Sequence, residues 1–302
     1  MFSERWENAM PEGNGPAVIS RRLRQQLREL RENAGLSQRE VVEQFDWSLS
    51  KLVRIENGPV GIAVADLMVL AELYGVSPDA KDHLLRLLRQ TRPQTKPERW
   101  WMEYRDVLPS QLQQFLALEY DASQIFMFHH SIVPGLLQTD DYIEVICRET
   151  AVQEMEPSRG ERLKEVRRRR AKELFAKAAL PQVVTLLDEA VLRRPVGGPA
   201  GMTAQLRRLA QLTEDDKMSL GVVPFSSDAY FGMTGAFHVM GFSGDLDHDV
   251  LYLENAPGSG SLQDKPDLVA FYRQRFDKMW DGAVKGTHAI AFLETIIADF
   301  AR

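Results

Sequence analysis

Four residues with hydroxyl or cationic side chains share one predicted helix: Ser48, Ser50, Lys51 and Arg54. Leu52 and Ile55 fall on the other side of that helix, where they can pack against a core. Hydroxyl groups hydrogen-bond base edges, and Lys and Arg bind guanine or phosphate in the major groove of B-DNA. The chemistry that these four residues favour is recognition of double-stranded DNA.

A preceding helix and a tight turn must position that helix. Ser37 and Glu40 match a capping box, in which each side chain accepts from a backbone N–H at a helix start. Asp46 stands at the predicted turn, because aspartate tolerates left-handed backbone angles, and Ser48 can cap the second helix. The segment SQREVVEQFDWSLSKLVRIENG therefore predicts a helix-turn-helix. The alternative is an ordinary corner between two helices, since capping boxes are common.

Residues 19–75 resemble the lambda-repressor/Cro-like, or xenobiotic-response-element, family of helix-turn-helix domains. The resemblance runs through RRLRQQLRELRENAGLSQREVV, then SKLVRIENG, then a predicted helix over 63–73 that ends in Tyr74-Gly75-Val76. It implies an all-α DNA-binding domain whose second short helix lies in the major groove.

The same resemblance implies roles for individual residues. Gln38 would contact a backbone phosphate, and Arg31 and Glu56 would form an ion pair between the first and third helices. The following residues would meet bases and phosphates: Ser48, Ser50, Lys51 and Arg54. Leu49 departs from the family, which often has a polar base-reading residue there; a leucine can touch only a thymine methyl.

Composition fits a protein of two globular domains. The 302 residues are 44% apolar and 26% charged, and the formal net charge of −6 argues against general coating of nucleic acid. DNA recognition needs only a local basic face, yet residues 20–58 hold eight Lys and Arg against six Asp and Glu. We therefore expect DNA affinity to depend on a homodimer or on a partner.

Helical periodicity and chain breakers outline an N-terminal domain at 19–92. We predict a flexible arm at 1–18 and a linker at 93–99, where Pro93 and Pro97 interrupt helix. Between them, five helices are predicted at about 20–34, 37–45, 48–57, 63–74 and 78–91.

A mixed α+β domain is predicted at 100–302. Runs rich in β-branched and aromatic residues indicate strands at 123–132, 182–187, 219–223, 235–240 and 250–253. Helical patterns indicate the main helices at 140–149, 159–177, 266–280 and 288–300. Their order in a sheet does not follow from the sequence. The four arginines at 167–170 would spread around one helix among acids and form a solvated face.

This region resembles the C-terminal domain of actinobacterial antitoxin-like transcriptional regulators, a group that includes the WhiJ-type developmental regulators. The pieces that carry the resemblance are VPGLLQTDDY, LDEAVLRRPVGG, GVVPFSSDAYFGMTGAFHVMGF, VLYLEN and FYRQRFDKMWDGAV. In that group the domain has no characterised biochemical function. The resemblance implies a transcriptional regulator, often encoded beside a small partner protein that it can bind.

Few residues suggest catalysis or metal binding. The lone Cys147 excludes an intrachain disulfide, and the six histidines form no HExxH motif. His129 and His130 are adjacent, so on a strand they face opposite sides and cannot chelate one ion together. Residues 255–261, NAPGSGS, lack the lysine of a phosphate-binding loop and are expected to be a flexible connection. We expect no enzyme, no metal and no cofactor.

The helix-turn-helix pattern thus predicts a sequence-specific DNA-binding regulator, and the resemblance implies a regulator of development or secondary metabolism in an actinobacterium. No run approaches 18 apolar residues, so no membrane segment is predicted, and we expect a cytoplasmic protein that joins the nucleoid when bound to DNA. Two alternatives stay open: an antitoxin-like interaction protein that binds a small partner and autoregulates, and a regulator that responds to an unknown small-molecule effector.

Overall fold

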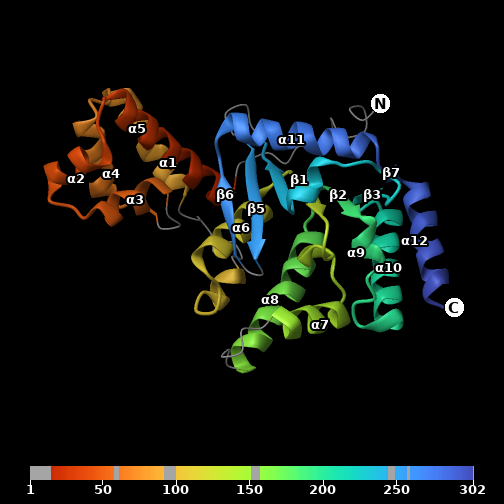
Figure 1. Cartoon of the computed structure of the whole chain (residues 1–302). Coiled ribbons are helices and arrows are strands. Elements are labelled where there is room, and N and C mark those ends of the chain that lie inside the picture. The colour runs from red at the N-terminus through yellow and green to blue at the C-terminus, as the bar shows by residue number, and fades with distance from the viewer. Residues whose placement is uncertain are drawn as a thin grey trace. The chain divides into compact units, whose positions relative to one another are not determined.

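The chain forms two compact units, and the boundary between them in the sequence lies between Trp100 and Trp101 (Figure 1). The computed structural model describes residues 15–57, 61–91, 100–150, 157–243, 249–256 and 259–301. The predicted linker at 93–99 and most of the predicted arm at 1–18 lie outside these residues. Residues 16–18 do not belong to an arm, because the first helix already begins at Pro16, a residue suited to the first helical turn.

The first unit is all-α, as predicted. Within the described residues it contains α1 (Pro16–Asn33), α2 (Gln38–Phe45), α3 (Leu49–Asn57), α4 (Val64–Leu73) and α5 (Pro78–Gln90). Each of the five predicted helices is present, and apart from the start of α1 their ends differ from the prediction by one residue at most. The local signals account for this agreement, since Ser37 and Ser77 cap α2 and α5 with their side chains.

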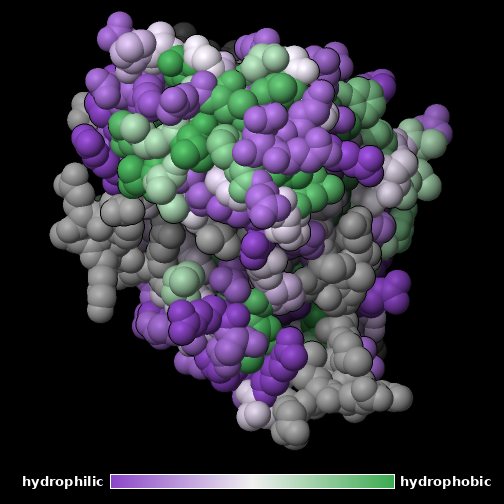
Figure 2. Space-filling model, turned by 90° about the vertical axis from the view of Figure 1, so that its left-hand side faces the viewer, coloured by the Kyte–Doolittle hydropathy of each residue, from purple (hydrophilic) through white to green (hydrophobic). Residues whose placement is uncertain are grey.

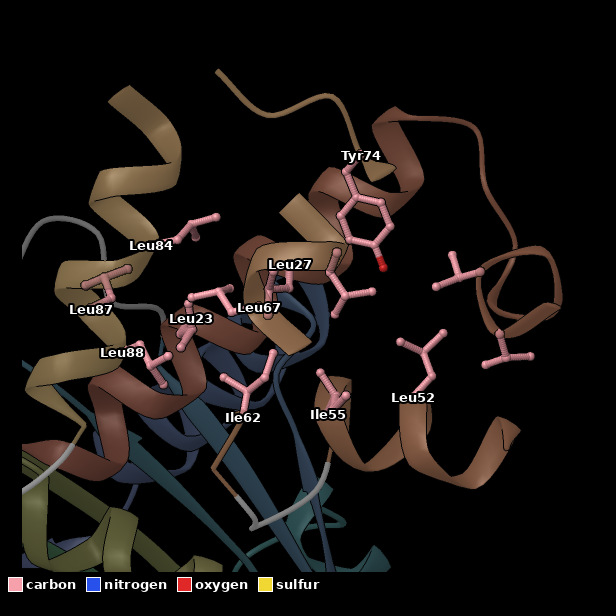
Figure 3. Close-up of a cluster of buried hydrophobic side chains, with 13 residues drawn as sticks. Leu23, Leu27, Leu52, Ile55, Ile62, Leu67, Tyr74, Leu84, Leu87 and Leu88 are labelled. Carbon is pink, nitrogen blue, oxygen red and sulfur yellow. The ribbon is translucent and has the colours of Figure 1, made fainter. Parts of the chain in front are cut away.

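Buried leucines from several helices build the core of this unit (Figure 3). Leu27 of α1, Leu52 of α3 and Leu67 of α4 are at most 1% exposed. Burying a leucine side chain stabilises a fold by about 1.5–3 kcal/mol relative to leaving it exposed. The core therefore fixes α3 by its apolar side and leaves the opposite side of that helix available.

In the residues that the structure describes, the second unit is built on a seven-stranded mixed sheet, which confirms the predicted α+β class. The strands are β1 (Gln124–His129), β2 (Gln182–Asp188), β3 (Ser219–Val223), β4 (Phe237–Gly241), β5 (Val250–Ala256), β6 (Ser259–Gln263) and β7 (Val284–Lys285). Their order is β6-β5-β4-β1-β2-β3-β7. Strands β1, β2 and β3 run parallel to their neighbours in this trio, and every other pair is antiparallel.

Two of these strands were not predicted. The segment 255–261 was expected to be a flexible connection, but its described residues belong to the ends of β5 and β6. Its glycines and serines have weak strand propensity, so pairing with β5, and not composition, makes β6 a strand. Strand β7 has two residues, too few for any periodic signal.

Helices connect the strands and cover the sheet. They are η1 (Trp100–Tyr104), α6 (Ser110–Asp121), η2 (Gly135–Leu137), α7 (Asp140–Thr150), α8 (Pro157–Phe175), α9 (Glu189–Arg193), α10 (Gly198–Glu214), η3 (Phe231–Thr234), α11 (Pro266–Asp281) and α12 (Thr287–Phe300). One face of the sheet packs its aromatic residues against α11, where the Phe126 and Phe276 rings lie 5.4 Å apart edge to face. The other face meets Phe115 of α6, whose ring lies 4.2 Å from that of Tyr252.

The arginines of α8 pair with acids of this unit. Arg168 binds Asp140 and Glu144, and Arg169 binds Glu103, so these cations are not a free patch for nucleic acid. Arg170 corrects the predicted solvated face: its side chain is 13% exposed and forms an ion pair with that of Glu119, which is 2% exposed. The Glu119 carboxylate is buried on α6, and a buried charge without a partner is unfavourable. The Arg170 side chain therefore points inward and supplies the opposite charge.

Among the described residues, every helix is too short or too polar to cross a bilayer.

Candidate DNA-binding surface

The turn between α2 and α3 has the predicted geometry. Ser37 Oγ accepts from the Glu40 N–H at 3.3 Å, and Glu40 Oε2 accepts from the Ser37 N–H at 2.7 Å. Asp46 ends α2 in the left-handed region, with φ 53° and ψ 41°. Ser48 Oγ then accepts from the Lys51 N–H at 3.3 Å and caps the start of α3. These local contacts fix how α3 leaves the turn.

Helix α3 presents one side to the core and one to solvent. Leu52, Ile55 and Glu56 are buried. The exposed side carries Leu49, Ser50, Val53, Arg54 and Asn57. Figure 2 draws one face of the molecule, on which hydrophobic and hydrophilic residues are mixed. The exposed side of α3 thus offers hydrogen-bond donors, a guanidinium and methyl groups together.

Three of the predicted DNA-contacting residues are exposed. The Ser48 and Ser50 hydroxyl oxygens lie 3.1 Å apart and share a hydrogen bond. Arg54 Nε donates to the Ser50 carbonyl at 3.2 Å, which holds the guanidinium along the helix surface. Among the residues that the structure describes, no carboxylate forms an ion pair with Arg54. Its terminal nitrogens are therefore free to donate to a base edge or a phosphate.

Lys51 is engaged within the unit. Its Nζ lies 2.8 Å from Asp66 Oδ1 of α4 and 3.6 Å from the centre of the Trp47 ring. The Lys51 side chain is 32% exposed and that of Asp66 is 23% exposed. To bind a phosphate, Lys51 has to exchange its carboxylate partner for the phosphate, which reduces its net contribution to affinity.

Gln38 is turned toward the interior of the unit. Its Nε2 donates to Glu56 Oε2 at 2.7 Å, so one amide N–H is used and the second is left. The predicted contact with a phosphate stays a prediction. Any such contact would connect the DNA backbone through Gln38 to a buried carboxylate of α3.

Arg31 and Glu56 form an ion pair between α1 and α3. Arg31 Nε donates to Glu56 Oε1 at 2.7 Å, and Nη2 lies 3.2 Å from Glu56 Oε2. The two side chains are 9% and 1% exposed. Arg31 Nη1 also donates to the Leu36 carbonyl at 2.9 Å. The pair is buried and nearly saturated with hydrogen bonds, so it locks α3 against α1.

Val53 of the exposed face was not predicted as a contact. It is 38% exposed, and Leu49, the residue predicted to be able to touch a thymine methyl, is 43% exposed. Val53 follows Leu49 by four residues and Ser50 by three, so helical spacing could have placed it on the same side. Asn57 was also missed; its Oδ1 accepts from Arg28 Nη1 of α1 at 3.3 Å.

Two family models match the chain. One is described as a helix-turn-helix domain and matches residues 22–84. The other is described as a domain of unknown function (DUF5753) and matches residues 112–295. Searches of curated proteins and of solved structures gave no significant match. The helix-turn-helix match covers every residue of the exposed α3 face and the ion pair beneath it, and it indicates DNA binding.

Proposed function

This chain belongs to the family of the DUF5753 domain, and we propose that it is a sequence-specific DNA-binding transcriptional regulator. The observation that carries the proposal is the exposed side of α3. Arg54 and Ser50 offer donors there, and Leu49 and Val53 offer methyl contacts, while Leu52 is buried beneath them. A major groove presents the complementary pattern of acceptors and thymine methyl groups.

The finer assignment rests on the resemblance of the C-terminal region to antitoxin-like actinobacterial regulators. We propose control of development or secondary metabolism, by a cytoplasmic homodimer whose DUF5753 domain sets assembly and regulation. We assign no enzymatic reaction to the chain. Genome-wide mapping of its binding sites, with attention to its own promoter, tests this assignment and supplies the operator.

Arg54→Ala is expected to weaken operator binding by about 1–3 kcal/mol if Arg54 donates to a guanine. Binding to unrelated DNA is then expected to change much less, so the ratio of the two affinities falls. Fluorescence anisotropy with operator and random duplexes measures both. Arg89→Ala removes the same charge from an exposed position of α5 and serves as the matched control. Unchanged operator affinity in Arg54→Ala would remove α3 from base reading.

Asp66→Asn is expected to strengthen binding to every duplex, because it removes an anion and releases Lys51 for phosphate. The slope of log affinity against log salt concentration is expected to steepen by about 1. Lys51→Ala is expected to weaken binding and flatten that slope. A Lys51→Ala protein with the wild-type slope would show that Lys51 stays on Asp66 in the complex.

A further inference from the structure

Three ligand-type side chains lie on one face of three neighbouring strands in the second unit. His238 of β4 is opposite Met127 of β1 and opposite Tyr252 of β5. His129 and Glu254 each stand two residues further along their strands, and side chains two residues apart share a face. The sheet therefore brings together His129, His238 and Glu254, although 109 residues separate the two histidines.

The ligand atoms are close enough for one ion. The Nε2 atoms of His129 and His238 lie 3.0 Å apart. One ligand atom of each of the three residues, Glu254 included, lies within 4.8 Å of the ligand atoms of the other two. Two nitrogens on a tetrahedral zinc ion are separated by about 3.3 Å, given bonds of about 2.0–2.1 Å. The two imidazoles need to part by only a few tenths of an ångström.

Both histidines are buried, and one nitrogen of each ring makes no hydrogen bond to the residues that the structure describes. His129 and His238 are 2% and 3% exposed. Within the described part of the chain, Nδ1 of each ring has no hydrogen-bond partner. Nε2 of each ring faces the other ring, so an ion held by the two Nε2 atoms would order both rings and recruit Glu254, but it would leave Nδ1 of each ring without a partner.

The charges around the two histidines are compatible with a cation. The nearby Arg170 guanidinium is balanced by Glu119, with which it makes hydrogen bonds of 2.6 and 2.5 Å. Glu254 is then the carboxylate left to neutralise an ion.

Aromatic rings border His238, whereas Glu254 is partly open to solvent. The Phe115 ring meets His238 edge to face, with centroids 5.4 Å apart, and the Tyr252 ring lies 6.0 Å from His238. The Glu254 side chain is 32% exposed, which gives an ion a route from solvent. Three protein ligands with one solvent-facing side match the open coordination of zinc sites that keep a water or another ligand.

We propose that His129, His238 and Glu254 bind a divalent transition-metal ion, and that zinc is the ion best suited to two imidazoles and one carboxylate. Sequence spacing predicted no metal site, because motif searches find ligands that are close along the chain. Here strand pairing, and not sequence proximity, collects the ligands. The site lies in the domain of unknown function.

Metal binding is tested on the full-length protein after treatment with a chelator. Added Zn²⁺ is expected to raise the melting temperature by about 5–10 °C at one hundred times the dissociation constant, because the ion binds the native state. Elemental analysis is expected to find one equivalent per chain. Co²⁺ is expected to give visible absorption bands of a four- or five-coordinate site. A folded wild-type chain that shows no thermal shift, no bound zinc and no Co²⁺ bands overturns the proposal.

Variants locate the ion. Glu254→Gln keeps the side-chain shape at a partly exposed position, and it is expected to lower Zn²⁺ affinity by about tenfold or more. His238→Gln is expected to remove the Co²⁺ bands. Glu294→Gln and His288→Gln change the same residue types at exposed positions of α12 and are expected to bind like the wild type. If Glu254→Gln binds Zn²⁺ as tightly as the wild type, the ion sits elsewhere and the proposal fails, whether or not His238→Gln folds.

Discussion

Glu56→Ala is expected to destabilise the helix-turn-helix unit by about 3–5 kcal/mol, because it leaves the Arg31 guanidinium buried without its carboxylate. The same change removes the acceptor of Gln38 Nε2. A loss of this size is a large fraction of the stability of a small domain. We therefore expect much of the unit to be unfolded near physiological temperature, with a corresponding loss of DNA affinity.

Thermal and urea unfolding of the isolated residues 1–95 measure this loss. Glu32→Ala is the matched control: Glu32 also contacts Arg31, at 3.2 Å, but its side chain is 60% exposed and its removal is expected to cost less than about 1 kcal/mol. Replacing Arg31 and Glu56 together by apolar residues is expected to recover part of the stability, since no buried charge then remains. A Glu56→Ala domain as stable as Glu32→Ala would contradict the assigned role of the pair.

Local signals in the sequence were sufficient for the elements of the helix-turn-helix unit. The capping box at Ser37 and Glu40 and the left-handed Asp46 depend on neighbours within a few residues, so the sequence determines them directly. Strand order, by contrast, is decided by pairing between distant segments. The seven-stranded order, including β6 and β7, has no counterpart in local periodicity.

The candidate DNA-binding residues divide in the same way. Helical spacing correctly placed Ser50 and Arg54 on the exposed side of α3. It could not show that Lys51 pairs with Asp66, a residue of the next helix, or that Gln38 turns toward Glu56. Such partners come from tertiary packing. Helical periodicity predicts which side of a helix a residue lies on, but it does not predict which residue of another helix pairs with its charge.

Because Lys51 is paired with Asp66, we expect the affinity for DNA to come mainly from the formation of a homodimer. With Lys51 paired, Arg54 is the cation on α3 that is ready to bind, so one unit is expected to hold DNA weakly. Regulators of this type place two recognition helices about 34 Å apart on a palindrome, and linking two modules raises affinity by roughly 10²–10⁴. We propose that the DUF5753 domain provides this link by forming a homodimer.

Residues 1–95 alone are therefore expected to bind the operator about 10²–10⁴-fold more weakly than the full chain, and the full chain is expected to sediment as a dimer. Anisotropy titrations and analytical ultracentrifugation measure the two quantities. Fusing residues 1–95 to an unrelated dimeric protein is the control: if avidity is the cause, the fusion regains most of the lost affinity, and if the DUF5753 domain touches DNA itself, the fusion does not. Equal binding by residues 1–95 and the full chain would mean that the second domain adds nothing to DNA affinity, and its role would then be to bind a partner protein or a small ligand.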